Sequence, residues 1–331
     1  MKLGIVGSGI IVKDFLTISH HLKHTSVLSL CCTKRSEEAA RALAKDYLIG
    51  QVFTDYEDFL RSEADTVYLG LPNHLHFSYA YQALLAGKNV IVEKPFTPTI
   101  EQATVLSRTA REKQLFLFEA VTTLYQPDYR RVKEMIPSLG SIKLVRCSYS
   151  QYSRRYDRFK NGEVLPAFDP GCAGGALMDI NIYNLHYAAG LFGKPESVHY
   201  FANIERGIDT SGVLLLDYGS FLCTLIGAKD CSAPNSCIIQ GDKGYLIQDG
   251  PANICEGGRV ILNDGSEETV GSHSSSHRMI GEFLEFEKMI FCGDLTTCYR
   301  YLDHTLCVCE ILTQARRMAG IEFPADGQEL Q

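Results

Sequence analysis

The chain has 331 residues, more than one ordinary hydrophobic core supports, so its length favours two domains. Its 45% hydrophobic and 21% charged residues are typical of a folded globular protein. The formal net charge of -7 argues against a nucleic-acid partner, because such partners select for a basic face. We therefore expect a small-molecule substrate.

The 12 cysteines are scattered and lack the C-x-x-C spacing of a metal site, so we interpret them as free thiols of a reducing compartment. The apolar run within residues 1–18 is broken by glycines and charges, unlike a signal peptide. No stretch approaches the roughly 20 apolar residues of a membrane span. These features predict a soluble, cytoplasmic protein with no metal site and no membrane partner.

The first part of the chain alternates short apolar runs with helical spacing, as in a parallel sheet covered by helices. Strands are expected over 2–6, 26–32, 66–69, 89–92 and 115–118, with a weaker one near Val52, and helices over 37–45, 74–86 and 99–113. This pattern predicts a doubly wound α/β domain over residues 1–121.

The pattern then changes to the apolar and polar alternation of antiparallel strands. Strands are expected over 143–149, 198–204, 213–217, 221–226 and 236–239, and helices over 174–191 and 276–318. We expect residues 122–331 to form an α/β domain with a large, mainly antiparallel open sheet that has helices on one side. An uncovered apolar face would then favour a homo-dimer or tetramer through this sheet.

The first expected strand runs directly into Gly7-Ser8-Gly9-Ile10-Ile11, and a helical pattern follows. The first glycine suits a tight turn, and the second lets the backbone approach a pyrophosphate at a helix N-terminus. Val12 replaces the third glycine, which predicts looser helix–strand packing. The βαβ context favours a Rossmann dinucleotide site at residues 7–11 over a glycine turn without a ligand.

The end of the second strand distinguishes the two nicotinamide cofactors. An acid there holds the 2′-hydroxyl of NAD, whereas basic residues accommodate the 2′-phosphate of NADP. This chain has Thr33, Lys34 and Arg35 there, with no acid before Glu37. The sequence therefore predicts NADP as the preferred cofactor and NAD as the alternative, unless Lys34 and Arg35 only form a solvated loop.

Ligands of open parallel sheets lie at the carboxyl ends of the strands. Lys94 follows one such strand, where an amine can exchange a proton with a carbonyl as hydride arrives, so it is the candidate acid or base. Lys94 is also expected to contact the cofactor, as are the neighbouring residues Leu71, Pro72, Asn73, His76 and Glu93.

Together, several motifs resemble the Gfo/Idh/MocA family, which is named for glucose–fructose oxidoreductase and inositol dehydrogenase. They are the opening glycine turn, 72–76, 86–88 leading to 93–95, 119–120, 169–170, 174–179 and 320–324. The resemblance implies an oxidoreductase with an N-terminal Rossmann domain, a C-terminal α/β domain with a large sheet, and oligomers formed through that sheet.

The resemblance also implies roles. Lys94 matches the family's catalytic lysine, and Asp179 and Tyr183 match the pair that faces the substrate. Asp179 and Tyr183 are four residues apart and so share a helix face, with His186 about one turn further. Tyrosine at position 183 is similar to the glucose–fructose oxidoreductase and dihydrodiol dehydrogenase branch, which prefers NADP.

Glu119, Asn181 and His186 are further candidates for substrate binding. For Asp179, Tyr183 and His186 the alternative is a structural role, in which the polar residues of a helix only bind neighbouring groups. Asn181 stands where the family commonly has glycine, and Leu124 where it often has arginine. The basic run at 154–160 is interpreted as a solvated face, with contact to an anionic substrate as the alternative.

The sequence thus predicts an NAD(P)-dependent dehydrogenase or reductase that acts on a CH–OH group of a sugar, polyol, diol or related carbonyl. One alternative is a NAD-assisted glycoside hydrolase, which would regenerate its cofactor in place. Another is a non-catalytic dinucleotide sensor on the same fold, against which the presence of both Lys94 and Tyr183 argues.

Overall fold

The computed structural model describes residues 1–271 and 277–328, and these form two compact units. The first unit contains Met1–Ala120 and Glu282–Leu306, and the second contains Val121–Gly281 and the chain from Cys307 onward. The sequence pattern predicts one division of the chain, between residues 121 and 122. The structure differs in that Glu282–Leu306 returns to the first unit.

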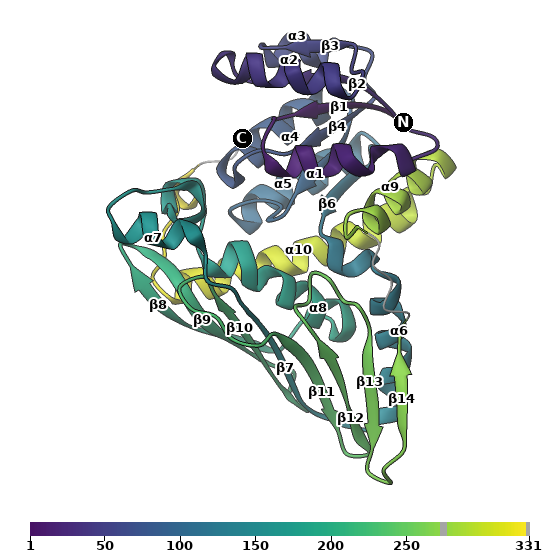
Figure 1. Ribbon diagram of the computed structural model, residues 1–331, viewed down its shortest axis with the longest axis vertical. Coiled ribbons are helices and arrows are strands. Elements are labelled where there is room, and N and C mark those ends of the chain that lie inside the picture. Colours follow the sequence, from purple (N-terminus) through teal and green to yellow (C-terminus); the bar gives the residue numbers. More distant parts are fainter. Residues whose placement is uncertain (272–276, 329–331) are drawn as a thin grey trace. The chain divides into compact units, whose positions relative to one another are not determined.

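The first unit is built on a parallel sheet of six strands in the order β3-β2-β1-β4-β5-β6 (Figure 1). The strands are β1 (Lys2–Val6), β2 (Ser26–Cys31), β3 (Gln51–Phe53), β4 (Thr66–Leu69), β5 (Asn89–Glu93) and β6 (Leu117–Ala120). This order reverses direction between β1 and β4, which is the switch point where doubly wound sheets bind dinucleotides. The predicted Rossmann fold is confirmed.

Amphipathic helices cover this sheet. They are α1 (Ile10–Ile18), α2 (Glu37–Asp46), α3 (Tyr56–Leu60), α4 (His76–Leu85), α5 (Ile100–Glu112), α9 (Ile280–Cys292) and the first part of α10 (Leu295–Met318). The rings of Phe283 on α9 and Phe15 on α1 have centroids 4.4 Å apart, and the rings of Phe286 and Phe118 are 4.5 Å apart. This aromatic packing explains why the segment from Glu282 joins the first unit.

The second unit contains a sheet of eight strands in the order β14-β13-β12-β11-β7-β10-β9-β8. The strands are β7 (Ile142–Ser150), β8 (Ser197–Glu205), β9 (Ile208–Asp217), β10 (Leu222–Ala228), β11 (Ser236–Gly241), β12 (Gly244–Asp249), β13 (Gly258–Leu262) and β14 (Glu267–Val270). Among the strands that the structure describes, β7 and β10 are the one parallel pair of this sheet, so the mainly antiparallel sheet is confirmed. Strands β12, β13 and β14 were not predicted.

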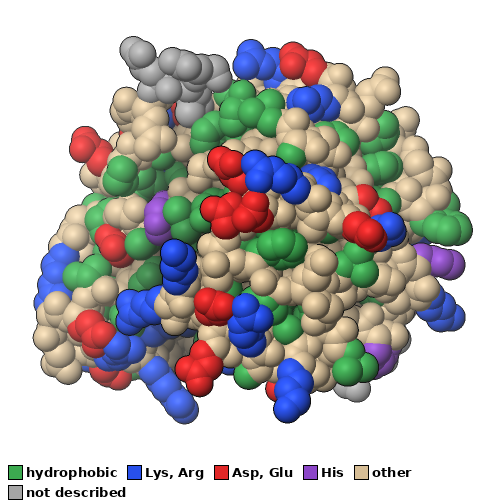
Figure 2. Space-filling view, turned by 90° about the horizontal axis from the view of Figure 1, so that it is seen from above, with side chains coloured by type: hydrophobic (Ala, Val, Ile, Leu, Met, Phe, Trp, Pro, Cys, Tyr) green, Lys and Arg blue, Asp and Glu red, His purple; other side chains and the backbone are tan. Residues whose placement is uncertain are grey.

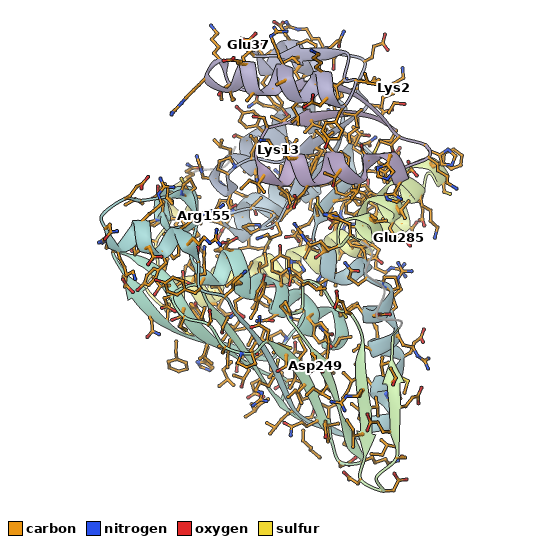
Figure 3. The ribbon with its side chains drawn as sticks, in the orientation of Figure 1. Lys2, Lys13, Glu37, Arg155, Asp249 and Glu285 are labelled. Atoms are coloured by element: carbon orange, nitrogen blue, oxygen red, sulfur yellow. The ribbon has the colours of Figure 1, made fainter. Side chains whose placement is uncertain are left out.

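The helices of the second unit are α6 (Pro127–Met135), α7 (Arg154–Lys160), α8 (Ile182–Phe192) and the end of α10. Figure 1 shows α8 on one face of the sheet. On the opposite face, side chains project from the strands with no helix of the described part of this unit over them (Figure 3). Large apolar residues that stay exposed on these strands include Leu144, Phe201, Val213, Leu222 and Tyr245.

All 12 cysteines are free thiols, and most are buried. Within residues 1–271 and 277–328, no helix is both long enough and apolar enough to cross a bilayer. The face seen in Figure 2 has basic and acidic side chains interspersed.

Candidate functional site

The turn after β1 has a backbone that only glycine fits. Gly7 has a φ of 112°, and its N–H donates to the Cys31 carbonyl at 2.9 Å. A Cβ placed on Gly7 would lie 2.4 Å from the Gly70 carbonyl oxygen, which follows β4. The turn therefore packs tightly between the ends of β2 and β4, the two strands that flank β1 in the sheet.

Gly9 caps the N-terminus of α1 without any side-chain hydrogen bond. A Cβ added to Gly9 would meet nothing within 4 Å, so the backbone here is open on its outer side. Ser8 is half-buried and Ile10 is 70% exposed at the same edge. A helix start whose first N–H groups receive no side-chain cap, beside an open glycine, fits the pyrophosphate of a dinucleotide, because these N–H groups can donate to its oxygens.

The expectation of looser packing at Val12 is wrong. Val12 is fully buried, and a Cβ on Gly70 would lie only 2.5 Å from a Val12 methyl carbon. The space that a third glycine would leave on the helix is instead supplied by the glycine at the end of β4. Helix α1 thus stays close to the sheet, with Ile11 half-buried above Gly70.

The segment after β2 presents exposed basic residues. Thr33, Lys34 and Arg35 are all exposed, and Thr33 precedes a single helical turn over Lys34–Ser36. Among the described residues, neither Lys34 nor Arg35 forms an ion pair. The nearest downstream acid, Glu37, binds Arg41 through two hydrogen bonds of 2.9 and 2.7 Å. The two cations of this segment are therefore not neutralised by the adjacent helix.

The buried side chain of His76 holds the loop after β4 in place. Leu71 and Asn73 are half-buried and Pro72 is exposed, whereas His76 has no exposed surface. The His76 ring nitrogens lie 2.9 Å from the Leu71 carbonyl oxygen and 2.8 Å from the Pro95 carbonyl oxygen. This ring thus connects the loops that follow β4 and β5. Burial lowers the pKa of His76, while the hydrogen bond to Pro95 opposes that shift.

The loop that carries Lys94 is held by buried carboxylates. Glu93 is 8% exposed and accepts a hydrogen bond of 2.7 Å from the Tyr68 hydroxyl. Glu119 is 4% exposed, and its two oxygens accept from the Phe96 N–H at 3.1 Å and the Thr305 hydroxyl at 2.9 Å. Glu119 therefore braces the loop instead of lying open to a substrate. Lys94 is half-buried at the end of β5.

The second unit builds a helix start at Gly174-Gly175. Gly175 has a φ of 102°, and the buried Asp209 carboxylate accepts the Leu177 N–H at 2.6 Å and the Tyr200 hydroxyl at 2.7 Å. Burial raises the pKa of Asp209, although these hydrogen bonds favour the ionised form. The carboxylate thus anchors the first residues of the helix that carries the candidate pair.

Asp179 and Tyr183 lie four residues apart across a change in helix type. Residues Leu177–Asn181 form a π-helical turn that continues into α8, and π-turns are frequent at functional sites. The Asp179 side chain is 36% exposed, whereas Tyr183 is 8% exposed. The Tyr183 ring lies 6.0 Å from that of Tyr149 on β7.

Lys229, which directly follows β10, was missed by the sequence analysis. Its Nζ lies 2.6 Å from the Asp179 carboxylate and 2.8 Å from the Ala167 carbonyl oxygen. No local pattern singles out a lysine after a strand, because its partners come from segments about 50 and 60 residues away. Only the fold brings this buried cation to a candidate substrate residue.

Asn181 and His186 have no exposed surface. The Asn181 amide donates to the Leu225 carbonyl at 3.2 Å and contacts Asn184, so it binds the sheet beneath the helix. A Cβ on Gly227 would lie 2.5 Å from that of Asn181, which explains how the larger residue fits. The side chains of Asn181 and His186 thus lie in the protein interior.

The basic run forms the short helix α7 (Figure 3, where Arg155 is labelled). Arg158 pairs with Glu163, and Lys160 pairs with Asp157 at 3.0 Å. Arg154 and Arg155 are exposed and form no ion pair within the described residues. The geometry supports a solvated face.

Comparison with known proteins identifies the chain's relatives. Residues 1–121 match the family described as "Oxidoreductase family, NAD-binding Rossmann fold", and residues 129–247 match the "GFO/IDH/MocA C-terminal domain". The chain is 31% identical to the uncharacterized oxidoreductase YgjR of Escherichia coli over 100% of both chains. It is 29% identical to the scyllo-inositol 2-dehydrogenase (NADP(+)) IolU of Bacillus subtilis, over 98% of this chain and 99% of that one.

Among solved structures, the fold is similar to that of KijD10, a 3-ketoreductase from Actinomadura kijaniata crystallised with NADP and TDP-benzene. The TM-score is 0.83 at 21% identity, over 96% of this chain and 97% of that one. At this identity the likeness supports the fold and not the substrate.

Proposed function

Since the chain belongs to the GFO/IDH/MocA family and is an NAD(P)-dependent oxidoreductase, we propose that it is an NADP-preferring dehydrogenase or reductase of a polyol, sugar, diol or related carbonyl. The observation that carries the cofactor preference is the exposed pair Lys34 and Arg35 at the end of β2. Because Glu37 is bound by Arg41, Lys34 and Arg35 are not engaged by this acid and can bind a 2′-phosphate. The relative IolU is named as an NADP(+) enzyme, which agrees with this proposal.

The cofactor preference is tested by Arg35→Asp, with Arg61→Asp as the matched control. Arg61 is exposed in the same unit but lies at the end of α3. We expect the parent protein and the control to bind NADPH more tightly than NADH, and Arg35→Asp to reverse or erase the difference. Fluorescence titration of both reduced cofactors measures it. Equal affinities in the parent protein would contradict the proposal.

We assign the proton transfer to Lys94 with Tyr183 as its partner, and the orientation of the substrate to Asp179. When bound, the nicotinamide ring accepts or supplies the hydride. The Lys94 amine exchanges the proton of the substrate oxygen, with the Tyr183 phenol as its partner in that exchange. The Asp179 carboxylate accepts hydrogen bonds from substrate hydroxyls and so orients them. A substrate with several hydroxyls suits this set of groups, as does the inositol named for IolU.

A screen of sugars, polyols and diols with NADP and NAD, followed by nicotinamide absorbance, tests the substrate class. We expect reduced nicotinamide to accumulate far beyond the enzyme concentration with at least one polyol or diol. A NAD-assisted hydrolase would instead release a cleaved glycoside with no net reduction of the cofactor. That result, or turnover restricted to carbonyls unrelated to these classes, would contradict the proposal.

We further propose a homo-oligomer formed through the uncovered face of the eight-stranded sheet. Register places Leu144, Leu222 and Val213 on neighbouring strands of that face, with Phe201 opposite Val213. Phe201 is 68% exposed, and an exposed face that carries several large apolar side chains favours burial against a second copy.

The free cysteines also support a location. Buried thiols without disulfides are typical of a reducing compartment. We therefore propose the cytosol as the compartment in which the protein acts.

A further inference from the structure

Lys229 is a buried cation with three partners. Its side chain is 4% exposed, and its Nζ contacts the Asp179 carboxylate at 2.6 Å and the Ala167 carbonyl at 2.8 Å. The Nζ also lies 4.4 Å from the centre of the Phe168 ring, within the range of a cation–π contact. The backbone N–H of Lys229 donates to the Thr210 carbonyl at 2.9 Å, which fixes the start of the side chain.

Asp179, the acidic partner of Lys229, is more exposed to solvent than the lysine. Asp179 keeps 36% side-chain exposure and lies in the π-helical turn, one helical turn before Tyr183. One partner of the ion pair is therefore buried and fixed, while the other partner faces outward.

A second buried cation provides the comparison. Arg316 is 1% exposed and pairs with Asp326 at 2.6 Å, and Asp326 also accepts the Phe323 N–H at 2.7 Å. The Asp326 carboxylate therefore binds groups of α10 and of the segment that follows it, where no functional residue was predicted. The Lys229 contact differs because its carboxylate belongs to Asp179, the residue assigned to orient the substrate.

We infer that Lys229 is a positioning residue for the reaction: it fixes the orientation and charge of the Asp179 carboxylate that receives the substrate hydroxyl. This inference rests on the proposed function of Asp179. Lys229 itself is too buried to meet a substrate, so its effect must pass through Asp179. A 1 Å displacement of an orienting group can lower turnover by about a hundred-fold.

Four proteins test the inference: the parent, Lys229→Met, Asp179→Asn and the double variant. Methionine has nearly the length of lysine without its charge. We expect kcat/KM to fall by on the order of a hundred-fold in Lys229→Met, mainly through kcat. The double variant should be within about threefold of Asp179→Asn, because the lysine has no further role once the carboxylate is gone. Cofactor affinity should stay at the parental value throughout.

Lys194→Met is the matched control, since Lys194 forms an ion pair of the same 2.6 Å length with Glu310 but is 58% exposed. Its turnover should be parental. If Lys229→Met alone fails to fold, the double variant removes both charges of the pair and its comparison with Asp179→Asn decides the question. A further hundred-fold fall in the double variant would overturn the inference.

The outcomes separate this inference from the proposed function. The substrate is whichever compound turns over in the screen, and every result is a ratio between variants on that compound. Parental turnover in Lys229→Met alone would overturn only the role of Lys229. Parental turnover in Asp179→Asn would overturn the role proposed for Asp179 and, with it, this inference. Turnover of an unexpected class of compound would overturn the substrate class alone.

Discussion

Replacing Gly7 with alanine should destabilise the turn after β1, because the residue has a φ of 112° and a Cβ there would lie 2.4 Å from the Gly70 carbonyl oxygen. A non-glycine residue at such a φ costs about 1–3 kcal/mol. Relief of the close contact adds about 1–3 kcal/mol. The combined loss of about 2–6 kcal/mol, at about 2–4 °C per kcal/mol, lowers Tm by about 4–24 °C.

Gly9→Ala is the matched control for backbone freedom and also tests the site. A Cβ on Gly9 meets nothing within 4 Å, and its φ of -74° suits any residue, so the fold should tolerate it. Reducing the freedom of the unfolded chain should even stabilise the protein by about 0.4–1 kcal/mol. NADPH affinity should nevertheless fall about tenfold or more, since the new methyl group occupies the approach of the pyrophosphate.

Two measurements check this pair: thermal unfolding without cofactor, and fluorescence titration with NADPH. Loss of affinity with retained Tm in Gly9→Ala would locate the dinucleotide at this turn. Parental affinity in Gly9→Ala would refute the site, and a parental Tm in Gly7→Ala would refute the argument from close packing.

Lys94→Ala should lose turnover by roughly a hundred-fold or more with little change in cofactor affinity, and Tyr183→Phe should lose less; parental turnover in Lys94→Ala would contradict the assignment. Burial lowers the pKa of His76 below its ordinary 6.5, so the unfolded chain binds more protons below that pH and stability falls as pH decreases through this window. His76→Asn should therefore lose less Tm than the parent between about pH 7 and about pH 5 in thermal scans, and an equal loss would refute the argument. Phe201→Glu should reduce the particle mass in light scattering toward that of one 36.8 kDa chain; a parental protein of that mass would contradict the oligomer.

The Rossmann unit was predicted well because its strands are buried apolar runs bounded by turns. Strand β4 is buried at every position and was predicted at its observed bounds, 66–69. Strand β6 begins at Leu117, two residues later than expected. The chain first closes α5 through a left-handed Gln114 and a hydrogen bond of 2.9 Å from the Leu115 N–H to the Ala110 carbonyl.

The missed strands lie at one edge of the second sheet. Strand β14 has three exposed residues followed by the buried Val270, so its sequence lacks the apolar alternation that marks a half-buried strand. Its conformation follows from pairing with β13, in which Val260 lies opposite Glu268. Such pairing is a property of the folded sheet and leaves little local signal.

In the candidate site, too, some residues could be predicted from the sequence and others could not. The glycine turn and Lys94 could be predicted because the position at the end of a parallel strand fixes where such residues lie. Burial could not be predicted: His76, Glu119 and Asn181 are polar residues that face inward and bind backbone groups. Their direction depends on loops and strands distant in sequence, as does the contact between Lys229 and Asp179.

The contact of Asn181 with Gly227 also constrains the order in which these positions can change during evolution. With asparagine at 181, any side chain at 227 would bring two Cβ atoms within 2.5 Å of each other, so the glycine is now held in place by its neighbour. Glycine at 181 would remove that contact, and the nearest atom of residue 181 to a Cβ at 227 would then be its backbone Cα, at 3.2 Å. The two positions should therefore vary together among homologues, and glycine at 181 eases the restriction at 227 without abolishing it.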